Sequence, residues 1–281
     1  MSGRPDNAVR DVAILAEKCY RHNMKIVAIG GGENGRPGHV YETKEIDEEI
    51  VKMAGKKNPA LLFIGFASGS ISYGEVMANI YKPLGCDCTQ LYESELGDTT
   101  LTKSKIEKAD IIYVGGGNTL RLMKMFRKYG IDKLLKTAGE KGTVLCGVSA
   151  GAICWCKYGQ SDFRKFQSGS DRFGRVTGLG FINALFSPHY DDAKRQKDLP
   201  LMMKTNNNLV ALAFDNCTAL KIIDEKYEVI KSNKNASAQK LFWNKNNFEA
   251  EYLISGSIAN LTKKRSHKTS LSTLSGSDEW S

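Results

Sequence analysis

The residues with the clearest chemical potential are those from 147 to 151, Gly-Val-Ser-Ala-Gly. They fit the G-x-S-x-G pattern of a nucleophile elbow, in which a sharp turn between a strand and a helix exposes a serine hydroxyl. An apolar stretch at 143–146 precedes the motif and a second one, at 152–155, follows it. Small flanking residues permit the strained turn, and the following helix directs its free N–H groups toward developing negative charge. The pattern predicts that Ser149 is a nucleophile rather than part of a structural turn.

A serine nucleophile needs a neighbouring base that takes its proton, and histidine commonly fills this role. The chain has four histidines, at positions 22, 39, 189 and 267. His22 lies at the end of a predicted helix, His39 lies in a polar loop, and His267 belongs to a basic segment near the C-terminus. His189 alone follows an apolar run, directly after Pro188, whose ring restricts the local backbone. By elimination, His189 is the predicted general base, the alternative being a surface loop histidine.

The histidine of such a site needs a carboxylate that holds its tautomer and stabilises its protonated form. Asp215 is the expected partner because it ends a predicted strand, 209–214, at the sheet edge where Ser149 should also lie. Asp191 and Asp192 are the rivals. They follow His189 so closely that they are poorly placed to orient its ring from behind. Both could instead bind a substrate ammonium group or simply be solvated.

Two backbone N–H groups must stabilise the oxyanion that forms when a serine attacks a carbonyl. One donor is expected from Ala150, directly after the nucleophile. The other is expected from Gly117, in the glycine-rich loop 115–118 that ends a predicted strand. This loop could also be a tight turn or a phosphate cradle, although no Walker-type lysine follows it. The glycines at 30–32 do not form a dinucleotide fingerprint, because no clear helix opens at the required spacing.

Apolar strand-like runs alternate with helical segments over most of the chain. The predicted strands are 25–29, 60–65, 89–92, 110–114, 143–146, 181–186, 209–214, 219–223 and 227–230. The predicted helices are 7–22, 47–53, 75–84, 101–108, 120–129, 131–141 and 199–204. Because the strands are continuous apolar runs, they fit an α/β protein with a mainly parallel sheet covered on both faces. Active sites of such proteins form at the carboxyl ends of the strands.

Residues 1–262 are expected to form a single α/β domain. Within it, the polar, glycine-bearing segment 158–177 is predicted to be either a loop over the site or a small hairpin. Residues 263–281 are basic and then rich in serine and threonine, which predicts a flexible tail.

The composition is that of an ordinary globular chain, with 281 residues, 41% hydrophobic and 25% charged. No apolar run reaches about 18 residues, and the N-terminus lacks the apolar core of a signal peptide, so we expect a cytoplasmic protein without membrane contact.

The net charge of +9 fits a solvated basic surface or an anionic small substrate, and no nucleic-acid partner is expected. The seven cysteines include no C-x-x-C pair, and no metal site is predicted.

Three motifs occur in order: Gly-Gly-Gly-Asn-Thr at 115–119, Gly-Val-Ser-Ala-Gly-Ala at 147–152 and Ser-Pro-His-Tyr at 187–190. With the strand and glycine loop at 28–33, they resemble peptidase family S51 over about residues 24–232. That family includes aspartyl dipeptidase (dipeptidase E) and cyanophycinase. The resemblance implies a three-layer, flavodoxin-like α/β sandwich related to class I glutamine amidotransferases, which carry cysteine at the elbow.

The resemblance also implies roles for individual residues. Ser149 matches the nucleophile, His189 the general base, and Gly117 and Ala150 the oxyanion donors. Asp215 falls where dipeptidase E has a glutamate as the third member of its triad.

Substrate contacts follow from the same resemblance. Arg195 lies shortly after the histidine motif, where aspartyl dipeptidases use an arginine on the substrate's side-chain carboxylate, and an exposed helix arginine is the alternative. Asn118, in the first motif, is the second expected substrate contact.

Together these features predict a serine peptidase that hydrolyses small peptides through an acyl-enzyme, without a metal or organic cofactor. Dipeptides with N-terminal aspartate are the candidate substrates, and a monomer or homodimer is expected. The alternatives are a cyanophycinase-like β-aspartyl peptidase, a noncatalytic binding protein on the same fold, and nucleic-acid binding through the basic tail.

Overall fold

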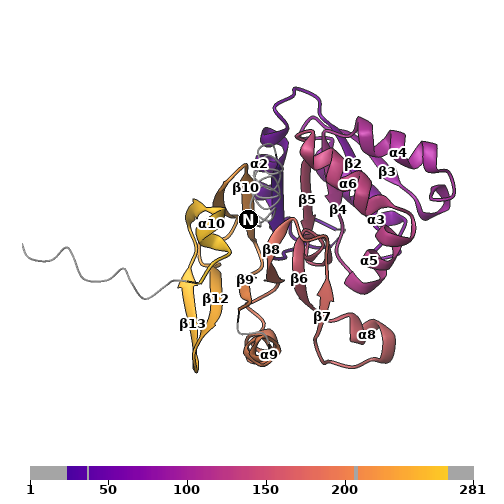
Figure 1. Ribbon diagram of the computed structural model, residues 1–281. Helices are drawn as coiled ribbons and strands as arrows, with labels where there is room; N and C mark the ends of the chain where they lie inside the picture. Colours follow the sequence, from indigo (N-terminus) through magenta and orange to yellow (C-terminus); the bar gives the residue numbers. More distant parts are fainter. Residues whose placement is uncertain (1–23, 37, 206–207, 265–281) are drawn as a thin grey trace, which may run out of the picture.

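The computed structural model describes residues 24–36, 38–205 and 208–264. The helix predicted at 7–22 lies outside the described residues, as does nearly all of the predicted tail. The described chain is an α/β protein in which helices pack around two sheets, as Figure 1 shows. The α/β class predicted from the sequence is confirmed.

The larger sheet has eight strands within the described residues, in the order β14-β11-β10-β1-β5-β4-β2-β3. Their bounds are β1 Lys25–Ile29, β2 Ala60–Ile64, β3 Asp87–Leu91, β4 Ile111–Val114, β5 Val144–Val148, β10 Thr218–Ile223, β11 Lys226–Lys231 and β14 Ser255–Ser257. Strands β1, β5, β4, β2 and β3 run parallel to one another. Strands β10, β11 and β14 extend the sheet antiparallel. The sheet is therefore mainly parallel, as the continuous apolar runs predict.

Helices cover both faces of this sheet and give it three layers. The bounds are α2 Lys44–Ala54 and α3 Ser72–Tyr81 on one face, and α4 Thr99–Lys108, α5 Thr119–Lys128 and α6 Ile131–Glu140 on the other. Alternate residues of β1 point to opposite faces, because side chains alternate along a strand. Val27 packs in the core that holds Ile50 of α2, whereas Ile26 packs in the core that holds Phe126 of α5.

A second sheet of six strands, in the order β13-β12-β9-β8-β6-β7, adjoins the first. Its strands are β6 Cys156–Ser161, β7 Gly174–Thr177, β8 Ile182–Ser187, β9 Val210–Phe214, β12 Ala238–Asn244 and β13 Asn247–Tyr252. The remaining helices are η1 Glu93–Glu95, α7 Ala150–Ile153, α8 Phe163–Ser168, α9 Ala193–Lys204 and α10 Ile258–Leu261. Figure 1 shows β12, β13 and α10 on the opposite side of the molecule from α4 and β3.

Two sequence predictions are refined here. The segment 158–177 is a hairpin in which β6 and β7 pair antiparallel, with α8 in the connection. The helix predicted at 199–204 begins earlier, at Ala193, because the Asp192 side chain accepts a hydrogen bond of 2.8 Å from the Lys194 N–H and caps its first turn.

The two sheets approach each other closely at the carboxyl ends of β1 and β9. A Cβ on Gly30 would lie 2.3 Å from the backbone oxygen of Asp215, so only glycine permits this approach. The Ser149 N–H donates to Ile29 O at 3.0 Å, and the His189 N–H donates to Gly30 O at 3.0 Å. The end of β1 therefore ties together the turns that follow β5 of one sheet and β8 of the other.

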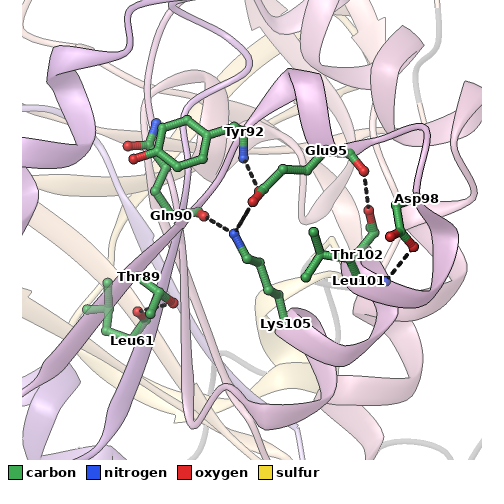
Figure 2. A network of polar contacts seen from close by, with 9 residues as sticks. All are labelled: Leu61, Thr89, Gln90, Tyr92, Glu95, Asp98, Leu101, Thr102 and Lys105. Atoms are coloured by element: carbon green, nitrogen blue, oxygen red, sulfur yellow. Dashed lines mark hydrogen bonds and ion pairs between the residues drawn. The ribbon is translucent and has the colours of Figure 1, made fainter.

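A polar network fixes α4 and η1 against the edge strand β3. Nζ of Lys105 lies 2.6 Å from Oε1 of Glu95 and 2.9 Å from the backbone oxygen of Gln90. Figure 2 shows the lysine directed toward both residues. Beside it, Arg121 of α5 pairs with Glu93 of η1 at 2.6 Å and also donates to the backbone oxygen of Phe66. The bond from Arg121 to Phe66 holds the loop after β2, which lines the site described next.

Candidate active site

Ser149 stands at the apex of a sharp turn between β5 and α7. Its backbone angles are φ 54° and ψ −108°, a conformation that costs energy for a residue with a side chain. The flanking glycines permit it, since a Cβ on Gly147 would lie 2.7 Å, and one on Gly151 2.0 Å, from Val114 O of the neighbouring strand. The structure thus has the strand–turn–helix geometry of a nucleophile elbow.

His189 faces Ser149 from the turn after β8. Its Nε2 lies 2.9 Å from Oγ of Ser149, within hydrogen-bonding distance. The residue has φ 50°, an uncommon value outside glycine, and its N–H is held by Gly30 O. Both strained residues therefore sit on turns that the end of β1 anchors, and this brings the two predicted side chains together.

The side chain that bonds to Nδ1 of His189 is Asn216 rather than Asp215, which corrects the sequence prediction. Oδ1 of Asn216 lies 2.7 Å from Nδ1 of His189. The Asp215 carboxylate instead accepts from the N–H of Ser237 at 2.8 Å and from its hydroxyl at 2.7 Å. Asp215 thereby ties the end of β9 to the start of β12. Successive residues beyond the strand point in opposite directions, so the neighbour of the predicted residue reaches the histidine.

The two rival aspartates have different surroundings. The Asp191 carboxylate accepts from the side-chain amide of Asn216 at 2.8 Å and from its backbone N–H at 3.1 Å. Asp192 caps α9 through Lys194. Neither carboxylate bonds directly to His189 within the described part of the chain.

The surroundings of His189 hold its pKa below the ordinary value. Burial is the largest cause, and the positive charge of Arg195 lowers the pKa further. The hydrogen bond to Asn216 and the charges of Asp191 and Asp162 act in the opposite direction without cancelling the shift. The lowered pKa favours the neutral ring, which is the form that a general base requires.

The two predicted oxyanion donors, Ala150 and Gly117, belong to segments that adjoin Ser149. Ala150 begins α7, so its N–H has no acceptor within the helix. Gly117 is in the loop after β4, where a Cβ on the adjacent Gly116 would lie 3.5 Å from Cβ of Ser149. Gly117 itself has φ 134°, and a Cβ there would lie 2.5 Å from Ala67 O. Glycine at position 117 therefore lets this loop pack closely against the loop after β2, whereas a Cβ at position 116 would make only ordinary contact with Ser149.

The two predicted substrate contacts differ in their surroundings. Oδ1 of Asn118 accepts from the Arg121 N–H at 3.1 Å, so this side chain caps α5. Arg195 is 5% exposed, which excludes the exposed helix arginine considered above. Its Nη1 donates to the backbone oxygen of Gln160 at 2.9 Å, and its Cζ lies 4.6 Å from the centre of the Phe173 ring. A buried cation that bonds to a backbone oxygen remains able to pair with an anion.

A cavity of about 550 Å³ opens beside the serine and histidine. Its wall includes Gly116, Gly117, Ser149 and His189. The loop after β1 contributes polar and charged side chains, including the ion pair of Arg36 and Glu33. The segment after β2 contributes serine hydroxyls, and α3, β4 and β5 contribute aromatic and aliphatic residues. Such a space accommodates a small organic molecule next to the reactive groups.

The fold and the serine–histidine pair are those of an α/β protein whose nucleophile elbow lies at the carboxyl ends of the parallel strands. The profile of peptidase family S51 matches residues 26–230. The chain belongs to peptidase family S51, and it is accordingly a peptidase.

Sequence relatives agree with this assignment. The chain is 30% identical over 222 residues to the uncharacterized peptidase YgaJ of Bacillus subtilis (strain 168), covering 77% of this chain and 91% of that protein. It is 32% identical over 121 residues to peptidase E of Salmonella gallinarum (strain 287/91 / NCTC 13346), covering 43% of this chain and 50% of that protein.

Solved structures share the fold at low sequence identity. A peptidase from an acI-B1 Actinobacterium superposes with a TM-score of 0.60 at 17% identity, covering 84% of this chain and 99% of that one. A putative peptidase E protein from Listeria monocytogenes EGD-e superposes with a TM-score of 0.55 at 19% identity, covering 74% and 98% of the two chains. Within the described ranges, no helix is long and apolar enough to span a membrane.

Proposed function

We propose that this chain is a serine peptidase that hydrolyses small peptides, with Ser149 as the nucleophile and His189 as the general base. The observation that carries the proposal is the 2.9 Å separation between Ser149 Oγ and His189 Nε2 at a strained elbow. Asn216 holds the other side of the imidazole ring in place of the expected carboxylate. The triad of the proposal is therefore serine, histidine and asparagine, an arrangement with precedent among Cys-His-Asn proteases.

In the acylation step, Oγ of Ser149 attacks the scissile carbonyl carbon while its proton passes to Nε2 of His189. The carbonyl electron pair moves onto oxygen, and the N–H groups of Gly117 and Ala150 stabilise this oxyanion. When the tetrahedral intermediate collapses, the C–N bond breaks and His189 protonates the leaving amine. The products are a free amine and an ester on Ser149.

In the deacylation step, a water molecule replaces the amine. His189 accepts a proton from the water as the oxygen attacks the ester carbonyl, and it then returns the proton to Oγ of Ser149. The acid product leaves, and the serine hydroxyl is restored. His189 alternates between neutral and protonated forms, and the lowered pKa favours its neutral form between turnovers.

The proposed substrate is a dipeptide with N-terminal aspartate. Arg195 supports this choice because its buried guanidinium lies close enough to His189 to lower the pKa of the imidazole. A substrate carboxylate within reach of Arg195 would add a direct ion pair to the longer-range charges of the aspartates around it, Asp162, Asp191, Asp192 and Asp198. Asn118 is assigned to cap α5 rather than to hold substrate directly.

The experiment that tests the function is hydrolysis of Asp-X, Leu-X and Ala-X dipeptides by the wild-type chain and by Ser149→Ala. The proposal expects turnover that Ser149→Ala abolishes, with Asp-X as the fastest substrate. Equal rates across the panel would remove the aspartyl specificity, and undiminished turnover by Ser149→Ala would remove the serine mechanism.

A further inference from the structure

We propose that Asp191 is a positioning residue that fixes the amide orientation of Asn216, and through it the tautomer of His189. This inference rests on the proposed function, since the tautomer matters because His189 must take a proton from Ser149. It concerns a carboxylate that does not touch the histidine and that the triad chemistry alone does not require.

A series of hydrogen bonds leads from Ser149 through His189 and Asn216 to the carboxylate of Asp191. Oδ2 of Asp191 accepts from Nδ2 of Asn216 at 2.8 Å, and Oδ1 of Asp191 accepts from the Asn216 backbone N–H at 3.1 Å. Oδ1 of Asn216 lies 2.7 Å from Nδ1 of His189, and Nε2 of His189 lies 2.9 Å from Ser149 Oγ. Both oxygens of Asp191 are thus directed at the same asparagine.

The chemistry of the carboxylate decides which way the amide points. An ionised carboxylate can only accept hydrogen bonds, so the group that Asn216 presents to Asp191 must be its NH₂. The carbonyl oxygen of the amide then faces His189. Because that oxygen can only accept, Nδ1 of His189 must carry the proton, and Nε2 is left with a lone pair toward Ser149.

An asparagine without this carboxylate would not select the tautomer. Its oxygen and nitrogen are nearly equal in size, so a half-turn of the amide exchanges them at little steric cost. In the turned orientation the NH₂ would donate to Nδ1 of His189 and leave the proton on Nε2. That tautomer directs an N–H at Ser149 and cannot remove its proton.

The backbone around Asn216 keeps the amide within reach of both partners. The N–H of the following residue, Cys217, donates to Gly31 O at 2.9 Å, and Cys217 has φ 60°. With the Asn216 N–H bonded to Asp191, two successive N–H groups are fixed at the end of β9. The remaining freedom of Asn216 is the rotation of its amide, which is the motion that Asp191 restrains.

The test compares Asp191→Asn with the matched control Asp192→Asn, which removes the same charge one position away. Asparagine caps helices about as well as aspartate, so Asp192→Asn is expected to keep wild-type activity within about twofold. Asp191→Asn replaces one of the two acceptor oxygens with a donor. The expected result is a roughly 10- to 100-fold lower kcat, with KM changed by less than about twofold.

A second readout reports the tautomer without relying on turnover. The ¹⁵N chemical shifts of His189, assigned by comparison with His189→Gln and recorded at about pH 8 where the ring is neutral, distinguish a protonated Nδ1 from a protonated Nε2. Wild type and Asp192→Asn are expected to show the proton on Nδ1, and Asp191→Asn a mixture of both forms. If Asp191→Asn retains both the shifts and the kcat of Asp192→Asn, the inference is overturned.

The two readouts also separate this inference from the proposed function. If no variant hydrolyses a peptide but the shifts of Asp191→Asn still change, the peptidase mechanism fails while the positioning role stands. If wild type turns over peptides and the shifts do not respond to Asp191→Asn, the positioning role fails while the mechanism stands.

Discussion

Gly31 lies directly against the ring of His189, at a distance that leaves no room for a side chain. A Cβ at position 31 would lie 2.3 Å from Nδ1 of His189 and 2.0 Å from Oδ1 of Asn216, both far inside van der Waals contact. The hydrogen-bonded pair therefore occupies the space that the missing side chain leaves. The glycine loop after β1 therefore leaves the space in which these two side chains meet.

We predict that Gly31→Ala lowers kcat/KM by at least about 100-fold, because the methyl group must push His189 or Asn216 out of hydrogen-bonding geometry. Steady-state kinetics on the best dipeptide substrate, with thermal unfolding measured in parallel, checks this. Gly97→Ala is the control, since Gly97 is exposed and a Cβ there meets nothing within 4 Å. Equal kinetics for the two variants would show that the space behind the histidine is not needed.

Neighbouring residues Asp215 and Asn216 are expected to respond in opposite ways to substitution. Asp215→Asn should destabilise the fold by about 1 to 3 kcal/mol, since its carboxylate bonds the N–H and hydroxyl of Ser237, while kcat stays within about threefold of wild type. Asn216→Ala should lower kcat by about 100-fold or more with a smaller loss of stability. Denaturant titration and kinetics measure both. A large fall in kcat for a well-folded Asp215→Asn would restore Asp215 to the site.

The lowered pKa of His189 predicts how activity depends on pH. The base must be unprotonated, so kcat/KM should fall only as the pH drops through a value below 6.5, the ordinary pKa of histidine. Arg195 lowers this pKa through its charge, so Arg195→Gln should raise it and move the acid limb to higher pH. The profile is measured with Ala-X, which has no side-chain carboxylate that could bind the arginine.

Lys194→Gln is the matched control for that experiment. Lys194 is the exposed neighbour of Arg195 and pairs with Asp171 at 2.9 Å, away from the histidine. Its profile should coincide with that of wild type. An acid limb that stays in place for Arg195→Gln would contradict the electrostatic coupling between Arg195 and His189.

The buried carboxylate of Asp47 predicts a pH dependence of stability. Asp47, 1% exposed in α2, accepts from hydroxyls of Tyr81 at 2.6 Å, Thr43 at 2.8 Å and Tyr41 at 3.0 Å. Burial nevertheless raises the pKa of Asp47 to about 6. The folded state therefore binds a proton more tightly than the unfolded state, and this group's contribution to stability falls as the pH rises between about 4 and 6.

The free energy of unfolding of wild type minus that of Asp47→Asn should accordingly decrease by roughly 1 to 2 kcal/mol from pH 5 to pH 7. Urea titrations of both proteins at several pH values measure this difference. A difference that does not change over this range would mean that Asp47 titrates at the same pH in the folded and unfolded chain.

The sequence was most informative where local patterns carry the geometry. The elbow motif with its apolar flanks located Ser149, and four histidines were few enough for elimination to identify His189. The inner parallel strands β1, β2, β4 and β5 were predicted within two residues because both of their faces are buried, which makes them continuous apolar runs. The Gly117 and Ala150 oxyanion donors were predicted from the glycine loop and the elbow, and the resemblance to peptidase family S51 added Arg195 as a site residue.

Other features depended on contacts that local patterns do not encode. Asn216 was missed because the search was for a carboxylate, and the choice between positions 215 and 216 depends on which side chain turns toward β1. The second sheet was missed because β6 and β7 are polar and glycine-bearing, and the β12–β13 hairpin turns at Lys245, with φ 53°, without a glycine signal. Asp191 acquires its place only through a hydrogen bond to a residue 25 positions away.

The most direct test of the central claim is covalent labelling of the wild-type chain by a fluorophosphonate, followed by mass spectrometry of the intact protein and its peptides. We predict one adduct per chain, located on Ser149, absent from Ser149→Ala and formed at least about 100-fold more slowly by His189→Ala. A wild-type chain that hydrolyses dipeptides but takes up no label on Ser149, or that labels equally fast without His189, would contradict a serine made nucleophilic by this histidine.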